Sequence, residues 1–172
     1  MSNETLSTPK PLRRSDIRNS FYSGAQELDD WIKTSAWQNQ KANNAVVYVT
    51  TQNETILGYY AIAASCYARD EAPEELKPNR RPKEIPCILL ARLAVDQRAQ
   101  GLGIGAGLLK DAIQRSYALS QQVGAAALLI YCRDKDARNF YLHYEIFLPS
   151  PANEMHLLLP MKQVGEILKK FQ

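Results

Sequence analysis

The sequence feature that most constrains the fold is a buried strand followed by a glycine-rich turn and a helix. Residues 86–95 (PCILLARLAV) form an apolar run broken by Arg92, as expected of a central strand covered on both faces. The glycines that come next are Gly101, Gly103, Gly105 and Gly107. From Ile104 to about residue 121, apolar residues recur at helical spacing. Residues 125–131 form a second buried strand, which should lie parallel to the first because a helical crossover connects them.

Hydrophobic patterns predict the other elements: a helix over residues 25–40, a hairpin of strands over 45–50 and 56–66, a short helix capped by Asp134, a strand over 155–159 and a helix over 161–170. Ser23 and Gln26 have the spacing of a capping box that opens the first helix. Together these patterns predict an α+β fold around a mixed sheet.

Composition suits one domain over residues 1–172, since 45% of the residues are hydrophobic and 23% are charged. Residues 1–10 are polar and are predicted to form a tail. Residues 69–86 carry prolines and sorted charges and are predicted to form a surface loop. The formal net charge of +3 is too small to indicate a polyanionic partner by itself.

The cysteines and the N-terminus indicate a cytoplasmic protein. Cys66, Cys87 and Cys132 are odd in number and widely spaced, so neither a disulfide framework nor a cysteine metal site is indicated. The first residues lack a signal-peptide pattern, and the longest apolar run, 123–132, is about half a membrane span. We therefore expect a soluble protein with no metal and no membrane partner.

Residues 98–105 (RAQGLGIG), which contain the glycine turn, have the composition of an anion-binding loop. Glycines let successive backbone amides face one ligand, and the following helix N-terminus adds partial positive charge. Gly101, Gly103 and Ala106 also match the dinucleotide fingerprint, but that motif belongs in the first strand–helix turn of a domain and needs an acidic residue about twenty positions on. Gln121 stands there instead. The sequence therefore disfavours a dinucleotide site.

The spacing Arg98-x-x-Gly101-x-Gly103 after a buried strand resembles motif A of the GNAT superfamily, whose members transfer acetyl from acetyl-coenzyme A to amines. The resemblance implies a mostly antiparallel sheet flanked by helices, an α/β sandwich with a central parallel strand pair. It also implies that the backbone amide of Val95 polarises the thioester and that the adjoining strand pairs with the pantetheine arm. The residues it places at the coenzyme are Leu93, Ala94, Val95, Arg98, Gln100, Gly101, Leu102, Gly103, Ile104, Gly105, Asn139 and Tyr141.

A narrower resemblance rests on residues 28–32 (LDDWI), 89–96 (LLARLAVD) and 139–141 (NFY). These segments are similar to the GNAT toxins of type II toxin–antitoxin systems, which acetylate the α-amine of aminoacyl-tRNA and block translation. The resemblance makes Tyr141 the general acid that protonates the leaving thiolate. It also implies a DNA-binding antitoxin and a homodimer. The family usually continues Tyr-x-x-x-Gly-Phe, whereas here Glu145, Ile146 and Phe147 follow, with no glycine and apparently one residue added.

The chemistry of the acceptor amine favours this reaction. An α-amine in an ester is largely neutral near pH 7 to 8, whereas a lysine ammonium, with a pKa of about 10.4, needs a base. The carboxylates considered for such a base are Asp96 and Glu145. Acetylation of a small amine or a protein N-terminus is the second hypothesis, and a non-catalytic coenzyme-binding domain is the third.

Binding of tRNA requires basic residues. The local positive charge is carried by Lys77, Arg80, Arg81, Lys83 and Arg92, against Glu84 alone between Lys77 and Arg92. We expect these cations to contact a phosphate backbone, with an affinity that falls steeply with salt. Further cations that could widen the patch are Arg13, Arg14, Arg18, Lys169 and Lys170.

Overall fold

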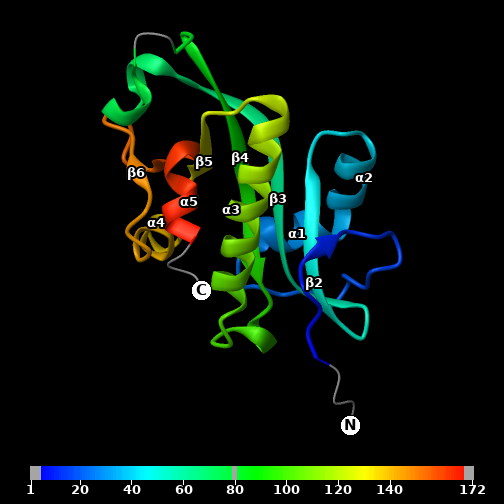
Figure 1. Ribbon diagram of the computed structural model, residues 1–172. Helices are drawn as coiled ribbons and strands as arrows, with labels where there is room; N and C mark the ends of the chain where they lie inside the picture. The colour runs from blue at the N-terminus through cyan, green and yellow to red at the C-terminus, as the bar shows by residue number, and fades with distance from the viewer. Residues whose placement is uncertain (1–4, 79–80, 169–172) are drawn as a thin grey trace. The chain divides into compact units, whose positions relative to one another are not determined.

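The structure is a computed structural model that describes residues 5–78 and 81–168. Its helices and strands follow one another (Figure 1) as β1 (Lys10–Pro11), α1 (Gln26–Thr34), α2 (Ala36–Lys41), β2 (Val46–Gln52), β3 (Thr55–Ala68), β4 (Glu84–Val95), α3 (Ile104–Val123), β5 (Ala127–Tyr131), α4 (Lys135–Leu142), β6 (Leu148–Pro149), β7 (His156–Pro160) and α5 (Val164–Leu168). Arg80, Lys169 and Lys170 lie outside the described residues.

The described strands are hydrogen-bonded in the order β1-β2-β3-β4-β5-β7-β6. The pairs β1/β2, β2/β3, β5/β7 and β6/β7 are antiparallel. β4 and β5 run parallel, with residues 87–89 opposite residues 127–129, because α3 connects them as a crossover. The predicted α+β fold, with a mixed, mostly antiparallel sheet and a central parallel pair, is confirmed.

The chain packs as two compact units. The first unit comprises Met1–Ala63 and Ala91–Ala112, and the second comprises Ala64–Leu90 and Ile113–Gln172. Within the described residues, no helix is both long and apolar enough to cross a membrane.

The core of the first unit lies where α1 and α2 pack with β2 and β3. Tyr59 is fully buried there, edge-on to Phe21 at 5.6 Å between ring centroids and stacked with Trp31 at 6.0 Å. Ile32 of α1 and Val47 of β2 are also fully buried in the same cluster. These side chains come from the apolar faces that the sequence periodicity marks.

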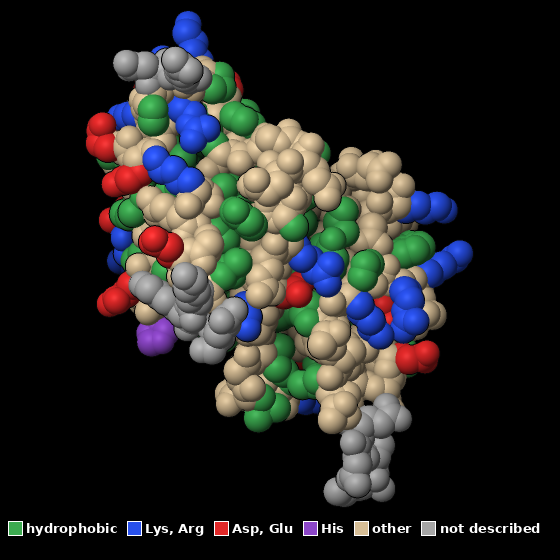
Figure 2. All heavy atoms as spheres, viewed as in Figure 1, with side chains coloured by type: hydrophobic (Ala, Val, Ile, Leu, Met, Phe, Trp, Pro, Cys, Tyr) green, Lys and Arg blue, Asp and Glu red, His purple; other side chains and the backbone are tan. Residues whose placement is uncertain are grey.

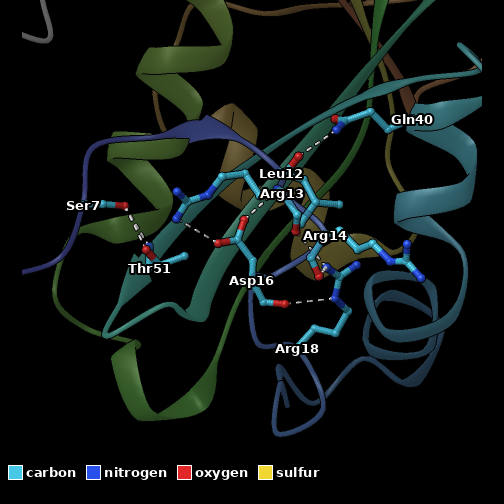
Figure 3. Close-up of polar contacts among 8 residues, drawn as sticks. All are labelled: Ser7, Leu12, Arg13, Arg14, Asp16, Arg18, Gln40 and Thr51. Carbon is cyan, nitrogen blue, oxygen red and sulfur yellow. Dashed lines mark hydrogen bonds and ion pairs between the residues drawn. The ribbon is translucent and has the colours of Figure 1, made fainter.

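The N-terminal segment is attached to β2 from Ser7 onward. The Ser7 amide donates to the Thr51 carbonyl at 2.8 Å, and the Thr51 amide donates to the Ser7 hydroxyl at 2.9 Å (Figure 3). Gln40 donates to the Leu12 carbonyl at 2.8 Å and accepts from the Val47 amide at 2.8 Å. Ser7 and Lys10, which lie in the segment predicted to be a tail, are therefore paired with β2.

The first helix begins and ends differently from the prediction. The predicted capping box is wrong: Ala25 is the N-cap and makes no side-chain cap, while the Asp29 carboxylate accepts from the amide of Ser23 at 2.9 Å and from its hydroxyl at 2.6 Å. A carboxylate oxygen accepts a hydrogen bond from Ser23 more strongly than the side-chain amide oxygen of Gln26 would. The predicted helix over 25–40 is also divided, since Ser35 separates α1 from α2.

Gly58 of β3 allows α3 to approach the sheet closely in the first unit. A Cβ at this position would lie 3.0 Å from Leu108 Cδ1 and 3.1 Å from Ile104 Cγ2. The hydroxyl of Tyr60 donates to the Asp111 carboxylate at 2.5 Å. These contacts fix the first turns of α3 on β3.

The second unit is built on β5, β7 and β6. Leu129 and Leu158 are fully buried in its core, and Leu76 from the segment before β4 is buried with them. That segment, predicted as a surface loop over 69–86, contains two short 3-10 helices and ends where β4 begins at Glu84. The cap predicted for α4 is confirmed, since Asp134 accepts from the Ala137 amide at 2.8 Å.

The chain leaves α4 through a turn in which Glu145 has a φ of 57°, in the left-handed region. This position is the fourth after Tyr141, where the resembling family has glycine. The chain therefore adopts a left-handed turn at this position although the glycine is absent. A residue with a Cβ pays roughly 1–2 kcal/mol for this conformation.

We predict that Glu145→Gly raises the free energy of unfolding by about 0.5–1 kcal/mol, because relief of the left-handed strain exceeds the extra backbone entropy that glycine loses. Urea denaturation of the two proteins measures this difference. Glu145→Ala is the control, since it removes the charge and keeps the Cβ. An equal gain with alanine would show that charge, not backbone strain, limits stability at this turn.

Candidate active site

The glycine turn lies in the first unit, between the end of β4 and α3. Asp96 accepts from the Arg98 amide at 2.8 Å and so caps a 3-10 turn over Gln97–Ala99. Gly101 and Gly103 then adopt φ values of 82° and 78°, which only glycine adopts without strain. The Gly103 carbonyl accepts the helical hydrogen bond of the Gly107 amide at 3.0 Å. The two left-handed residues thus bend the chain directly into α3.

The space around the two left-handed glycines is open. No other described atom would lie within 4 Å of a Cβ at Gly101 or Gly103. Leu102 between them is 69% exposed. The first amides of α3, at Ile104 and Gly105, belong to the helix turn that has no intrahelical acceptor. These features suit the approach of an anionic ligand to the main chain, as the sequence predicts for residues 100–105.

Arg98 is paired with a carboxylate of the turn itself. Its Nε and Nη2 donate to the two oxygens of Asp96 at 2.9 and 3.0 Å, and Asp96 also accepts from the Tyr22 amide at 2.9 Å. Burial alone would raise the pKa of Asp96, but the hydrogen bonds from Arg98 and Tyr22 lower it below its usual value. Asp96 is therefore a structural anion and a poor candidate for the general base. The Arg98 charge that we predicted for the phosphate is shared with this carboxylate.

The amide of Val95 faces away from β3. The next amide along the chain, that of Asp96, donates to the Leu57 carbonyl at 2.8 Å, and successive residues of a strand point their backbone groups to opposite edges. The Val95 carbonyl accordingly accepts from the Gln100 side chain at 3.0 Å rather than from β3. Gln100 also donates to the Ser23 carbonyl at 3.2 Å. The amide of Val95 thus points to the edge of β4 where the resemblance places the coenzyme. By the same alternation, the amide of Leu93 points to that edge as well. The side chain of Ala94 is buried in the core.

Tyr141 lies in the second unit, on α4. Its side chain is 6% exposed and contacts Phe147 edge-on at 5.9 Å between ring centroids. Burial raises the pKa of Tyr141, and the nearby Cys132 adds to the rise. The phenol is therefore protonated at neutral pH, as a general acid must be. Among the described residues none hydrogen-bonds its hydroxyl, and Asn139 two positions earlier is exposed.

The predicted basic residues are divided between the units. Lys77, Arg81 and Lys83 belong to the second unit, where Lys77 pairs with Glu74 at 3.7 Å. Arg92 belongs to the first unit, where its guanidinium lies 4.3 Å from the ring centroid of Trp31. The four of these cations that the structure describes therefore belong to two different units.

The first unit contains a second group of basic residues, which is held by hydrogen bonds to backbone atoms of the same segment. Arg18 donates to the carbonyls of Arg13 and Arg14 at 2.9 and 3.1 Å, and the buried Asp16 accepts from the Arg13 amide at 2.7 Å (Figure 3). Lys and Arg side chains gather over this N-terminal segment (Figure 2). Arg14 is exposed and projects away from the network.

Comparison with known proteins identifies the family. The model of the acetyltransferase (GNAT) domain matches residues 43–145. A tRNA-acetylating toxin of Mycobacterium tuberculosis (strain ATCC 25618 / H37Rv) is 36% identical over 94% of this chain and 96% of its own. The chain belongs to the GNAT family of acetyltransferases.

Solved GNAT structures agree with this assignment. AtaT complexed with acetyl-methionyl-tRNAfMet is 28% identical, with a TM-score of 0.86 over 95% of this chain and 99% of its own. A Tyr-to-Phe variant of AtaT, bound to the C-terminus of the antitoxin AtaR and to acetyl-CoA, is 25% identical, with a TM-score of 0.80 over 96% and 99% of the two chains. The GNAT fold predicted from the sequence is confirmed.

Sequence reasoning missed two side chains of this GNAT site. Gln100 was predicted to act through its backbone, yet its side chain ties the turn to β4. Trp31 was assigned to the helix core, yet it also holds Arg92. The signal for the second was available, because a charge in the middle of an apolar strand needs a partner.

We predict that Gly103→Val weakens acetyl-CoA binding at least tenfold, because a β-branched residue resists the left-handed conformation and its side chain would fill the open space over the turn. Calorimetric titration measures the affinity. Gly107→Ala is the matched control: its position is helical, with open space beside it and no positive φ, so affinity should be unchanged. Retained affinity in a folded Gly103→Val protein would exclude the turn as the pyrophosphate site.

Proposed function

We propose that this protein is a toxin that transfers acetyl from acetyl-CoA to the α-amine of aminoacyl-tRNA and thereby blocks translation. The observation that carries the proposal is the 36% identity to a tRNA-acetylating toxin across nearly the full length of both chains. The AtaT structure with acetyl-methionyl-tRNAfMet supports the same acceptor class. Ribosomal translation places this activity in the cytoplasm.

The proposed reaction divides the work among a few groups. The amides of the glycine turn bind the coenzyme pyrophosphate, and the Val95 amide donates to the thioester carbonyl. The neutral acceptor amine attacks that carbonyl carbon, an N–C bond forms, and the C–S bond breaks. Tyr141 gives its proton to the leaving thiolate, the new ammonium loses its proton to solvent, and solvent returns a proton to Tyr141. General acid catalysis of this kind contributes about 10²–10⁴ in rate.

The carboxylates of this chain support an acceptor that needs no strong base. Asp96 is buried, and the hydrogen bonds of Tyr22 and Arg98 hold it as an anion, so it is poorly suited to take a proton from an ammonium. Glu145 is exposed in the turn after α4. The α-amine of an aminoacyl ester is already largely neutral at pH 7 to 8.

The proposal includes a partner that controls the toxin. AtaT has been solved with the C-terminus of the antitoxin AtaR, and the AtaT–AtaR complex has been solved bound to DNA. We infer a DNA-binding antitoxin for this chain as well. A homodimeric toxin remains our prediction from the family resemblance.

Incubation of the purified protein with radiolabelled acetyl-CoA tests the acceptor. Charged total tRNA, deacylated tRNA, peptides and small amines are offered in parallel. We expect label in charged tRNA and none in the deacylated control, because only the former carries the α-amine. Label confined to a peptide or a small amine would show that this molecule is the acceptor, and it would overturn the proposed toxin activity.

Tyr141→Phe tests the general acid. Phenylalanine keeps the edge-on contact with Phe147, so we expect a stable protein with kcat reduced about 100-fold or more and acetyl-CoA affinity nearly unchanged. Tyr144→Phe, two residues beyond the end of α4, is the control and should retain kcat. If Tyr141→Phe instead lost coenzyme binding while remaining folded, Tyr141 would have a structural role only.

A further inference from the structure

Arg92 is a half-buried cation without a carboxylate partner among the described residues. It lies within β4, and its one described contact is the Trp31 ring, 4.3 Å from the guanidinium carbon to the ring centroid. A ring face attracts a guanidinium but does not neutralise it. A partly buried charge that lacks a counter-ion is costly unless a ligand supplies one.

The ring that holds Arg92 is itself fixed by the core. Trp31 stacks with Tyr59 at an interplanar angle of 17°, and the buried Tyr59 hydroxyl donates to the Leu28 carbonyl at 2.8 Å. Trp31 and Leu28 come from α1, whereas Tyr59 comes from β3. The position of the Arg92 guanidinium is therefore set by two elements of the first unit besides its own strand.

The buried carboxylate of Asp29 on α1 is held by Ser23 and not by Arg92. The Asp29 carboxylate is 4% exposed, and one oxygen accepts from the amide and hydroxyl of Ser23. Its other oxygen is buried without a hydrogen-bond partner among the described residues. Asp29 is thus bonded to Ser23 rather than paired with Arg92, although it lies on the same helix as Trp31.

This geometry suits a phosphate. A guanidinium that lies over an aromatic ring can still donate from its N–H groups, and those donors match two oxygens of a phosphodiester. Arg92 precedes Val95 by three residues of extended strand, about 10 Å. In an aminoacyl-tRNA, one ribose separates the aminoacyl ester from the phosphodiester on the 5′ side of the terminal adenosine. A phosphate bound at Arg92 would thus accompany an ester presented near the proposed thioester-polarising amide.

We propose that Arg92, held over the Trp31 ring, binds the phosphodiester next to the aminoacylated terminal nucleoside of the acceptor, an assignment that rests on the proposed function. Arg92 and Trp31 are positioning residues in this scheme, since they place the acceptor and do not touch the reacting atoms. The Trp31 contact also explains why an arginine interrupts an otherwise apolar strand.

Two acceptors separate this role from a structural one. Charged tRNA contains the phosphodiester, whereas 3′-O-aminoacyl-adenosine carries the same amine and ester without it. For Arg92→Ala we expect the KM for charged tRNA to rise at least tenfold, with kcat and the KM for acetyl-CoA within twofold of wild type. With aminoacyl-adenosine, variant and wild type should agree within twofold. The slope of log(kcat/KM) against log salt for charged tRNA should become less negative by about 0.7–0.9.

Further variants test the stacked geometry. Arg92→Lys keeps the charge and loses the planar fork, and Trp31→Leu keeps the arginine and loses the platform, so both should raise the KM for charged tRNA severalfold. Lys33→Ala, an exposed cation on α1, is the control and should change neither kinetic constant. Thermal melting confirms that each variant is folded.

Each contrary result has a distinct meaning. Equal losses on charged tRNA and aminoacyl-adenosine would overturn the phosphate assignment while leaving the proposed function intact. A raised KM for acetyl-CoA would show that Arg92 binds a phosphate of the coenzyme, and it would overturn the proposal as stated. A wild-type protein that acetylates neither acceptor would refute the proposed function and this inference together.

Discussion

The rest of the proposed coenzyme site depends on the buried carboxylate of Asp96. A charge with 1% residue exposure is stable only when both oxygens are hydrogen-bonded, and here Arg98 and Tyr22 supply the donors. Because these donors come from the glycine turn and from the segment before α1, one anion fixes two parts of the first unit to the end of β4. The turn is thereby ordered without using the amides of its glycines.

Two left-handed turns in this chain show when glycine is required. At Gly101 and Gly103 the protein leaves open space, so no neighbour forbids a Cβ. The positive φ and the proposed approach of a phosphate both disfavour a side chain at these two positions. At Glu145 a smaller positive φ, 57° against 82° and 78° at the two glycines, is reached with a side chain present. A strain of roughly 1–2 kcal/mol is tolerable where nothing has to approach the main chain. At Gly101 and Gly103 the larger positive φ and the proposed ligand contact both favour glycine before α3.

Local pattern predicted the strand, the glycine turn, the helix and the parallel pairing of β4 with β5, because periodicity and crossover handedness act over neighbouring elements. The cap at Asp134 was predictable for the same reason. Sequence spacing did not reveal that Asp29, rather than Gln26, binds Ser23, or that Trp31 holds Arg92. Those contacts depend on how α1 lies against its neighbours. The roles assigned to Val95 and Tyr141 came from family resemblance, and the structure adds the direction of one amide and the burial of one phenol.

The described groups divide acid and base chemistry unequally. Tyr141 has a raised pKa and keeps its proton, so it can serve the leaving thiolate. Asp96 is an anion whose oxygens already accept hydrogen bonds from Arg98 and Tyr22, so it is poorly suited to act as a base. An enzyme with a proton donor and no strong acceptor must select amines that are neutral before they bind. The choice among such amines then falls to groups that recognise the rest of the acceptor molecule. A fixed, uncompensated guanidinium three residues before the proposed thioester-polarising amide is suited to that selection.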